Sequence, residues 1–481
     1  MTARRLCTAA CVLLASLGLA GCVTAPAYVK PEVMVPPSWS GEGPWRAAQP
    51  ADTQPKGSWW ERFGDADLNA LEQQAMSANQ SLAAAQSRLL QARATLGGNA
   101  ANTMPQVGAG LRAQRLEISA NRPLTNYAAP NWQTIQNDYV PTFAVNYEID
   151  LAGRVKSLVD GARASLEQAG ADLENTRLIL AADLASNYFN LRALDSELDV
   201  LTRSIALQQS SLELAIHRHD LGVASGLDVA QQQALLDTTL TQVDILKRQR
   251  AQLEHAIATL VGTPAPQFVL PVKVSPMTPP LIPVGIPSEV LQRRPDVASA
   301  ERAMAAANAQ IGVANAAFYP SLNFGLNGGL DSRLFSEVMN GPSIFWSMGV
   351  SATQTLFDGG RIQSNVDFTR AGFEVAVANY RRVVLTAMQE VEDGISSVNA
   401  IDRAYNQAQK AIESNRRVLQ IAFDRYQGGI ANSQDVIIAQ QSQLNSERLA
   451  AQLLGQRLLT SVFLVKALGG DWQAAGSSGA P

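Results

Sequence analysis

The chain has 481 residues, of which 42 are acidic and 38 basic, and its net charge is −4. The hydrophobic content of 46% excludes a disordered chain, and the near balance of charges gives no basis for nucleic-acid binding. Charged residues make up only 17%, below the usual fraction of about a quarter, so uncharged polar side chains and alanine must cover much of the surface.

The first 22 residues have the pattern of a lipoprotein signal peptide. Two arginines at positions 4 and 5 precede an apolar stretch, residues 12–20, which is too short to span a bilayer. The stretch runs into Leu19-Ala20-Gly21-Cys22, an order that resembles a bacterial lipobox. We therefore expect residues 1–21 to be removed and an acyl lipid such as palmitate to be attached to Cys22. An ordinary signal peptide with an incidental cysteine is the alternative.

Side chains that perform catalysis or bind metals are scarce. All three cysteines lie within the first 22 residues, which excludes a structural disulfide framework. The histidines are His217, His219 and His255, and the first two, two residues apart on a predicted helix, do not share a face. We predict no catalytic site, no metal site and no cofactor. A lipid-anchored enzyme, the alternative class, lacks a recognisable chemical site.

Proline divides the chain, because it fixes φ and disrupts a helix interior. Seven of the 23 prolines lie between residues 26 and 55, and nine lie between residues 264 and 295. These clusters predict an extended segment over residues 22–65, after the cysteine, and a linker over residues 263–287.

The first half of the chain, residues 66–262, is predicted to form helices and two strands. Leucines at intervals of three, four and seven between Leu173 and Leu201 lie on one face of a helix. Residues 139–150 instead alternate between apolar and polar side chains, which is the period of a strand. We expect helices at about 66–100, 154–221 and 226–262, and strands at about 105–117 and 139–150.

The second half, residues 288–469, repeats the first. Gly153-Arg154 is matched by Gly360-Arg361, and Gly222 is matched by Gly429, at a constant offset of 207. The two glycines Gly222 and Gly429 are expected to end the long helices at hairpin tips, as glycine does just past a helix C-terminus. We expect helices at about 288–317, 361–428 and 433–468, strands at about 320–331 and 344–357, and a flexible tail at 470–481.

The long helices and the strands favour a membrane protein that oligomerises. A helix of this length measures about 100 Å and cannot bury its apolar stripe in a single globule. Alternating strands also suit a half-buried soluble sheet, but the predicted lipid anchor and the strand lengths favour a membrane crossing. Four strands cannot close a barrel, and lipid tolerates no open sheet edge. Two copies would supply eight strands and three would supply twelve, and these arguments do not choose between them.

Several short segments carry a resemblance to a known family. They are Trp59-Trp60-Glu61-Arg62-Phe63, Gln91-Ala92-Arg93-Ala94, Arg293-Arg294-Pro295-Asp296, Phe318-Tyr319-Pro320 and Phe357-Asp358-Gly359-Gly360-Arg361. In these segments the chain resembles the outer-membrane efflux factors of the TolC and OprM type, in the lipoprotein subgroup named after NodT. The resemblance implies a mostly α-helical homotrimer with membrane β-strands. Four strands per chain would form a 12-stranded β-barrel, continuous with a long periplasmic α-helical barrel.

The resemblance also implies a passive conduit in the cell outer membrane rather than an enzyme. Such a conduit would export small molecules, such as drugs or aromatic compounds, together with a periplasmic adaptor protein and an inner-membrane pump. A channel for type I protein secretion is the alternative within the same fold, and the lipobox favours small-molecule efflux over it. A structural lipoprotein without a pore is a third hypothesis.

The hairpin tips are the candidate site that the resemblance implies. A gate that closes the tunnel would involve Asp228 and Asp435, each six residues after a tip glycine, with Tyr426 near Asp228. The alternative is that both acids merely stabilise helix N-termini through the helix dipole. The residues expected to contact the adaptor are Gly222, Val223, Gly429 and Ile430.

Two positions near the tips depart from the family's pattern. Ala431 occupies a place where some relatives carry arginine, and Ile438 a place where they carry a second acid. The gate would then be weaker, or would rely on Arg218 or Arg425 instead.

A helix start is predicted where the linker ends. Pro295 moves Arg294 out of the α region, and Asp296 lies in the first turn of the following helix, where a negative charge is favourable. We therefore assign Arg294, Pro295 and Asp296 a structural role.

Overall fold

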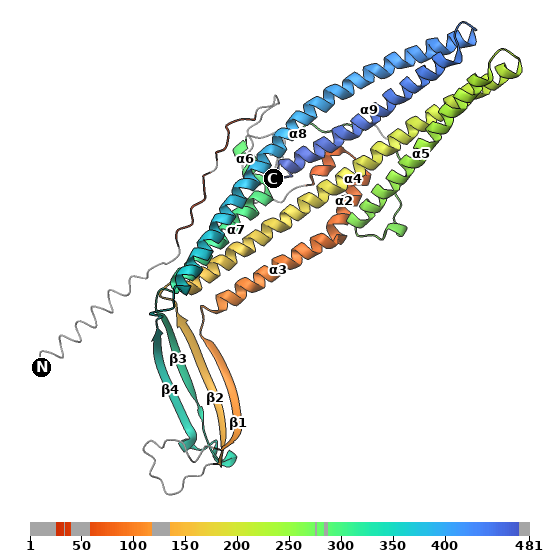
Figure 1. Ribbon diagram of the computed structural model, residues 1–481. Coiled ribbons are helices and arrows are strands. Elements are labelled where there is room, and N and C mark those ends of the chain that lie inside the picture. Colours follow the sequence, from red (N-terminus) through yellow and green to blue (C-terminus); the bar gives the residue numbers. More distant parts are fainter. Residues whose placement is uncertain are drawn as a thin grey trace, which may run out of the picture. The chain divides into compact units, whose positions relative to one another are not determined.

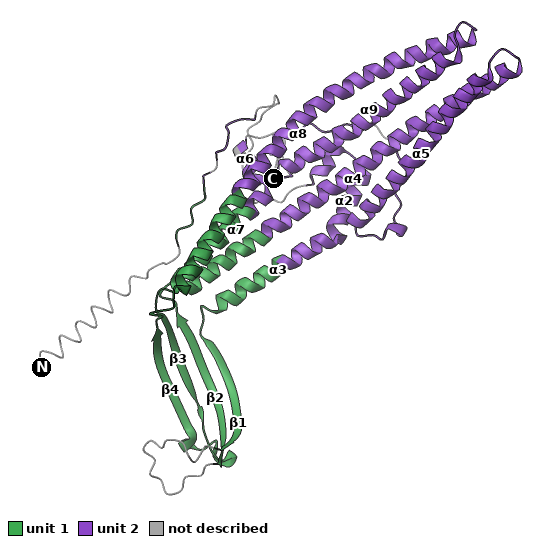
Figure 2. Cartoon of the chain, viewed as in Figure 1, with its two compact units in different colours: residues 1–31, 89–169, 300–380 green, residues 32–88, 170–299, 381–481 purple. Residues whose placement is uncertain are grey.

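A computed structural model describes residues 26–32, 34–39, 58–117, 135–274, 277–282 and 287–470. Cys22 and the predicted tail beyond residue 470 lie outside the described residues. The chain divides into two compact units, one of residues 1–31, 89–169 and 300–380, and one of residues 32–88, 170–299 and 381–481 (Figure 2). Each unit contains segments from both predicted halves, so the compact units do not coincide with the halves seen in the sequence.

The first unit contains a four-stranded antiparallel sheet of order β1-β2-β3-β4 (Figure 1). The strands are β1 (Gln106–Glu117), β2 (Ile135–Ile149), β3 (Ser321–Leu330) and β4 (Ile344–Thr353). All four predicted strands are present, but β2 begins four residues earlier than expected and β4 ends four residues earlier. The pairing of β3 with β4 ends at Ser321 opposite Thr353, so residues beyond Thr353 have no strand beside them.

One face of the sheet keeps apolar side chains uncovered within the chain. On β4, Trp346, Met348 and Val350 are 74%, 65% and 62% exposed, and Leu111 on β1 is 78% exposed. These residues follow the predicted alternation on β4. A contiguous exposed apolar patch of this kind marks a surface that another molecule or a lipid phase covers.

The long helices form two hairpins, α4 with α5 and α8 with α9 (Figure 1). The helices α4 (Arg154–Asp220) and α8 (Arg361–Gln427) each have 67 residues, and α5 (Gly226–Leu260) and α9 (Ser433–Ala467) each have 35. These bounds lie within two residues of the predicted ones. Among the helices of the described part, none combines the length and the hydropathy that crossing a bilayer requires.

Two predicted helices are each broken in two. The helix expected at 66–100 is divided into α2 (Ala66–Ala78) and α3 (Gln80–Ala101), because Asn79 is extended and its side chain caps α3 by accepting from the backbone of Leu82 at 3.0 Å. The helix expected at 288–317 is divided into α6 (Pro287–Arg293) and α7 (Pro295–Ala316). Pro295 causes the second break, because a residue before proline avoids the helical region.

A buried network of charges fixes the linker to the second unit. Asp195 on α4 is fully buried and accepts hydrogen bonds from Arg192 at 3.0 Å, from Arg250 of α5 at 2.7 Å and from the backbone of Lys273 at 3.1 Å. The two arginines donate in turn to the carbonyls of Pro271 and Leu270. The linker therefore packs against one face of α4 and α5.

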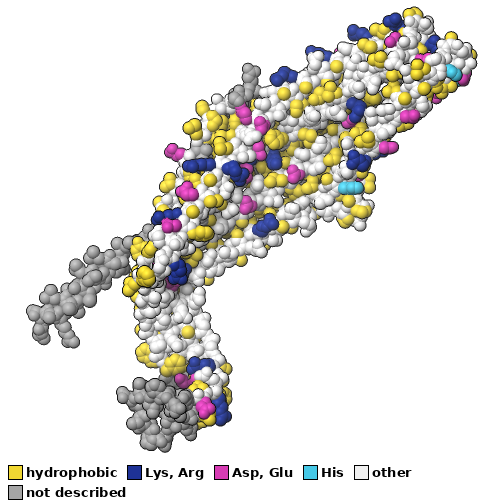
Figure 3. Space-filling model, in the orientation of Figure 1, with side chains coloured by type: hydrophobic (Ala, Val, Ile, Leu, Met, Phe, Trp, Pro, Cys, Tyr) yellow, Lys and Arg dark blue, Asp and Glu magenta, His cyan; other side chains and the backbone are white. Residues whose placement is uncertain are grey.

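The surface agrees with the low charge content of the sequence. On the face drawn in Figure 3, charged side chains are scattered, and uncharged polar and hydrophobic side chains fill the space between them. The core of the second unit includes an apolar cluster in which residues distant in sequence meet. Its buried members are Trp39, Val290, Val391, Ile395, Leu464, Ala467 and Leu468.

Candidate functional site

The hairpin tips are built on two glycines with left-handed backbones. Gly222 and Gly429 have φ angles of 74° and 73°, and they lie just past the ends of α4 and α8, as predicted. The amides of Gly222 and Val223 donate to the carbonyls of His219 and Arg218, a Schellman ending that satisfies the last carbonyls of α4. Gly429 and Ile430 form the same ending on α8. The left-handed backbone explains why glycine occupies both positions.

The helices that leave the tips begin with side-chain caps. Ser225 caps α5 in a capping box, in which its hydroxyl accepts from the Asp228 amide and the Asp228 carboxylate accepts from the Ser225 amide at 2.9 Å. Asn432 caps α9 by accepting from the Asp435 amide at 3.1 Å. Both acids therefore occupy the first turn, where the helix dipole favours a negative charge. Asp228 and Asp435 are therefore both placed where they stabilise a helix N-terminus through the helix dipole, which was the alternative to a role in the gate.

Two contacts join the first hairpin tip to the second. The hydroxyl of Ser433, the first residue of α9, donates to the Asp228 carboxylate. The guanidinium of Arg218 on α4 donates to the carbonyl of Tyr426 on α8 at 2.7 Å, and it lies over the Tyr426 ring at 4.6 Å from the centroid. We call Arg218, Asp228, Tyr426 and Ser433 the tip clasp.

The contacts within the tip clasp favour the charged form of the Asp228 carboxylate. The hydrogen bond from Ser433, with help from the capping box and Arg218, holds the pKa of Asp228 below its usual range. Burial raises the pKa of the Tyr426 phenol, against the opposing effect of Arg218, so the phenol stays neutral at physiological pH. Asp228 therefore carries a full negative charge opposite the second hairpin.

Asp228 and Tyr426, which the sequence placed near each other in the gate, form no hydrogen bond in the described part of the chain. Asp228 uses its carboxylate for Ser225 and Ser433 instead, and the buried Tyr426 hydroxyl has no hydrogen-bond partner in this part of the chain. Tyr426 contributes through its ring and its carbonyl, both of which contact Arg218. Ala431 cannot supply the cation that some relatives carry as an arginine at this place. Of Arg218 and Arg425, the two arginines proposed instead, Arg218 is the one that contacts Tyr426.

The remaining predicted tip residues face away from the protein. Asp435 is exposed, and its side chain contacts no hydrogen-bond or ion-pair partner among the described residues. Val223 and Ile430 are 65% and 73% exposed, and the neighbouring Leu221 is 80% exposed. The tips therefore expose apolar side chains at the surface of the described chain. Within the described ranges, no group of three or more potential metal ligands comes together.

A scan against protein families matches residues 71–263 and 286–470 to the family described as outer membrane efflux protein. The chain belongs to this family. The predicted recognition is confirmed, and the family consists of efflux channels, as expected for a protein without an enzymatic activity. The two matched segments contain both hairpins and all four strands.

Named relatives support the same assignment at full length. The chain is 30% identical over 467 residues to the pyoverdine export outer membrane protein OpmQ of Pseudomonas putida, covering 96% of this chain and 97% of the relative. It is also 30% identical over 476 residues to the toluene efflux pump outer membrane protein TtgF of Pseudomonas putida, covering 95% of each. The efflux function and the outer-membrane location predicted from the sequence are therefore confirmed at this level.

A solved structure confirms the fold. The outer-membrane channel OprN superposes with a TM-score of 0.81 and 28% identity, covering 93% of this chain and 100% of the channel. The predicted fold class, long helices joined to a four-stranded membrane sheet, is that of an outer-membrane channel.

The predicted helix start has a structural role in this efflux protein. Arg294 is 6% exposed and lies in the break between α6 and α7. It donates to Asp296 through two nitrogens at 3.0 and 2.6 Å, to the Ala467 carbonyl at 3.0 Å, and lies 2.6 Å from the Glu390 carboxylate. One guanidinium thus joins α7, α8 and the end of α9, which extends the structural role predicted for Arg294.

Ser433 is the tip residue that the sequence did not reveal. It stands at the position that corresponds to Gly226 in the first half, at the same offset of 207 as the tip glycines. This change from glycine to serine was the available signal, because a hydroxyl there can donate where glycine cannot. Its acceptor could not be identified, because Asp228 lies 205 residues away along the chain.

Proposed function

We propose that this efflux protein is the trimeric outer-membrane channel of a tripartite pump that exports small molecules. The observation that carries this proposal is a membrane-type sheet with two open edges in a chain of the outer membrane efflux protein family. In the described ranges, β1 and β4 form the edges of the sheet, and neither has a second neighbour.

Edge closure supports an obligate assembly. Each unpaired backbone group in hydrocarbon costs several kcal/mol, so strands that cross the outer membrane must form a closed barrel. Joining β4 of one copy to β1 of the next closes the sheet without changing its order. Three copies give a barrel of twelve strands, the number that the family resemblance implied, within the range of known outer-membrane barrels. The long helices would line the periplasmic part of the conduit.

The cargo is proposed to be small molecules. The relatives' names refer to pyoverdine export and toluene efflux, and both of these cargoes are small molecules rather than proteins. A passive conduit supplies no energy, so an inner-membrane pump and a periplasmic adaptor are the required partners. The exposed apolar side chains at the tips, Val223 and Ile430 among them, would contact the adaptor.

The lipid anchor is proposed at Cys22 on the pattern of its preceding residues. Several acyl chains or an inserted barrel hold a protein stably, whereas a single chain gives only marginal binding. Cys22→Ala should therefore abolish metabolic acyl labelling and leave trimers in the outer membrane. Acyl labelling that persists in this variant would contradict the assignment.

The tip clasp is proposed to hold the periplasmic end of the conduit closed. Arg218 and Asp228 join the two hairpins of one chain, and the threefold axis would bring three copies of the exposed Asp435 together. Three carboxylates near one axis repel each other and attract cations. Separating the hairpins breaks the contacts of Arg218. The strongest of these is its charged hydrogen bond to the Tyr426 carbonyl, which contributes about 1.5–3 kcal/mol.

Single-channel recordings of variants test the gate. Arg218→Ala should raise the ratio of open to closed channels by roughly 30-fold for each clasp that must open, which corresponds to about 2 kcal/mol per clasp. Tyr426→Phe is the matched control, because it keeps the ring and the carbonyl that Arg218 contacts. Asp435→Ala should reduce the block by divalent cations. Recordings of Arg218→Ala, Asp228→Ala and Asp435→Ala that all match the wild type would leave Asp228 and Asp435 with a dipole role only.

Export in cells tests the overall function. A strain without this protein should accumulate a small fluorescent efflux substrate, and the wild-type gene should restore its export. The comparison would be made in a background that lacks every parallel outer-membrane channel. Equal accumulation of the substrate with and without this protein in that background would contradict the proposal.

A further inference from the structure

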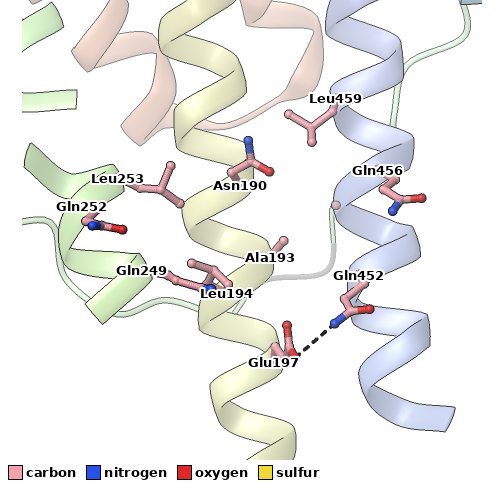
Figure 4. A pocket seen from close by; sticks show the side chains of 11 residues that line it. Asn190, Ala193, Leu194, Glu197, Gln249, Gln252, Leu253, Gln452, Gln456 and Leu459 are labelled. Atoms are coloured by element: carbon pink, nitrogen blue, oxygen red, sulfur yellow. Dashed lines mark hydrogen bonds between the residues drawn. The ribbon is translucent and has the colours of Figure 1, made fainter. Parts of the chain in front are cut away.

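A hollow of about 450 Å³ lies between α4, α5 and α9 in the second unit (Figure 4). Asn190 and Leu459 lie at one end and Glu197 and Gln452 at the other, while Gln252 on α5 and Gln456 on α9 lie on opposite sides of α4. The volume falls in the range of about 300–1,000 Å³ that is typical of sites for small molecules.

Carboxamides and leucines dominate the lining of the hollow. The amides belong to Asn190, Gln249, Gln252, Gln452 and Gln456, and the leucines are Leu194, Leu253 and Leu459. Each primary amide offers two N–H donors and one carbonyl acceptor. The side chains of Gln249, Gln252 and Gln456 form no hydrogen bond with any described residue, so their donors and acceptors are available to a ligand.

The charge in the hollow is already neutralised. Glu197 is 3% exposed and accepts from Arg448 at 2.8 Å and from Gln452 at 3.2 Å. Arg448 also donates to Gln242 of α5 at 2.9 Å and so connects all three helices at this end. A neutral ligand therefore meets no unpaired charge, whereas an ion would have to lose its hydration without gaining a counter-ion.

The floor of the hollow is fixed by a close approach of two helices. A Cβ atom on Gly455 of α9 would lie 2.6 Å from the Cβ of Ala193 on α4, so only glycine permits this spacing. Gly455 is buried and Glu197 is held by two partners, so the hollow exists before any ligand enters. A preformed site lowers the cost of binding.

The hollow opens on the face of α4 that is opposite to the linker. Tyr188 and Arg192 contact Asp65 and the linker on one side of the helix. At about 100° per residue, Asn190 and Glu197 lie roughly 200° and 180° around α4 from Tyr188. In a conduit whose outer side carries the linker, the hollow would face the lumen.

We propose that this hollow is a cargo-binding site inside the conduit, and that it takes uncharged planar molecules with both hydrogen-bond donors and acceptors. The amides bind the polar edge of such a molecule, and the three leucines contact its ring faces. Recognition without charge fits a passive conduit, because the ligand can leave at low cost. The inference rests on the proposed conduit function, which assigns the lumen-facing side.

Acridone is a suitable probe, because it is neutral, fluorescent and planar, with one N–H donor and one carbonyl acceptor. Its binding would be measured by fluorescence anisotropy on the full-length protein in lipid nanodiscs, with empty nanodiscs as the blank. Wild-type protein should bind acridone saturably, with one site per chain. N-methylacridone, which lacks the donor, should bind at least fivefold more weakly.

Variants locate the site. Gln456→Trp fills the hollow and should weaken acridone binding at least tenfold. Gln441→Trp is the matched control, because Gln441 is also an exposed glutamine of α9 but lies about 22 Å along the helix. A double variant of Gln249→Leu and Gln252→Leu should reduce the preference for acridone over N-methylacridone, because two of the amides that can accept the N–H are gone.

Three results would overturn the inference. The first is that acridone shows no saturable binding, and the second is that wild type and Gln456→Trp bind it equally. The third is that Gln456→Trp dissociates the oligomer, because this result would show that a neighbouring chain covers the hollow. Conductance steps from the same nanodisc protein, transferred to planar bilayers, test the conduit separately. Steps without acridone binding contradict this inference alone, whereas the absence of steps contradicts the proposed function.

Discussion

A buried carboxylate on α2 should make the stability of this helix depend on pH. Glu72 has no exposed surface, and both of its carboxylate oxygens are without a hydrogen-bond partner within the described residues. Burial raises the pKa of Glu72 from 4.5 to about 9, so the side chain is neutral at pH 7. Folding therefore requires Glu72 to take up a proton. At pH 7 this uptake lowers the free energy of unfolding by about 3 kcal/mol relative to a neutral side chain in its place.

The sign of the effect follows from the two pKa values of Glu72. Between pH 4.5 and about 9 the folded state holds one more proton than the unfolded state, so stability falls as pH rises. The free energy of opening α2 should fall by about 1.4 kcal/mol per pH unit in this window. Glu72→Gln keeps the shape of the side chain and carries no titrating group, so its slope should vanish.

Hydrogen exchange of the α2 amides in the intact protein measures this free energy, after correction for the intrinsic exchange rate. Between pH 5 and 8 the wild type should lose about 4 kcal/mol of protection, and Glu72→Gln should lose almost none. Glu61→Gln is the control, because Glu61 is exposed on the short helix η1 (Trp59–Phe63). Equal slopes in the wild type and Glu72→Gln would refute the argument.

Three further predictions concern the helix ends. Gly262→Ala should destabilise the protein by at least about 2 kcal/mol in thermal unfolding, because its φ is 73° and a methyl group would lie 2.6 Å from the Ala78 carbonyl oxygen. Arg294→Met removes the cation from the partly buried carboxylates of Asp296 and Glu390 and the donor from the Ala467 carbonyl, and should cost about 3 kcal/mol by the same assay. An unchanged midpoint of unfolding would show that these contacts are not needed for stability. Tryptophan at both Gly222 and Gly429 should lower export and leave the trimer intact. Export at the wild-type level in this double variant would count against a role of the two glycines in contacting the adaptor.

The elements that local sequence determines could be predicted to within a few residues. Gly222 and Gly429 end the long helices because their left-handed backbones close Schellman turns, and this signal is visible in the sequence alone. The β-strand β4 was recognised by its alternation, but its end was not, because the end depends on where its partner β3 begins. Pro295 marks the break before α7, because the residue before a proline avoids the helical region, and this signal is also visible in the sequence.

The features that the sequence did not reveal depend on contacts between distant segments. The tip clasp requires Arg218 and Tyr426, which are 208 residues apart, to meet at their tips. Glu72 belongs to a helix with an ordinary polar and apolar pattern, so its burial could not be foreseen from that pattern. The hollow around Gln456 combines side chains from three helices. In each case the residue types were visible, but their neighbours were set by packing.

The central claim is that the sheet of one chain completes a barrel only with other copies. Native mass spectrometry of the purified protein, followed by recording of the same sample in planar bilayers, tests it most directly. The account predicts an assembly of three chains and discrete conductance steps from that assembly. A stable monomer that inserts into bilayers and conducts would contradict it, because the edges of β1 and β4 would then be open to lipid.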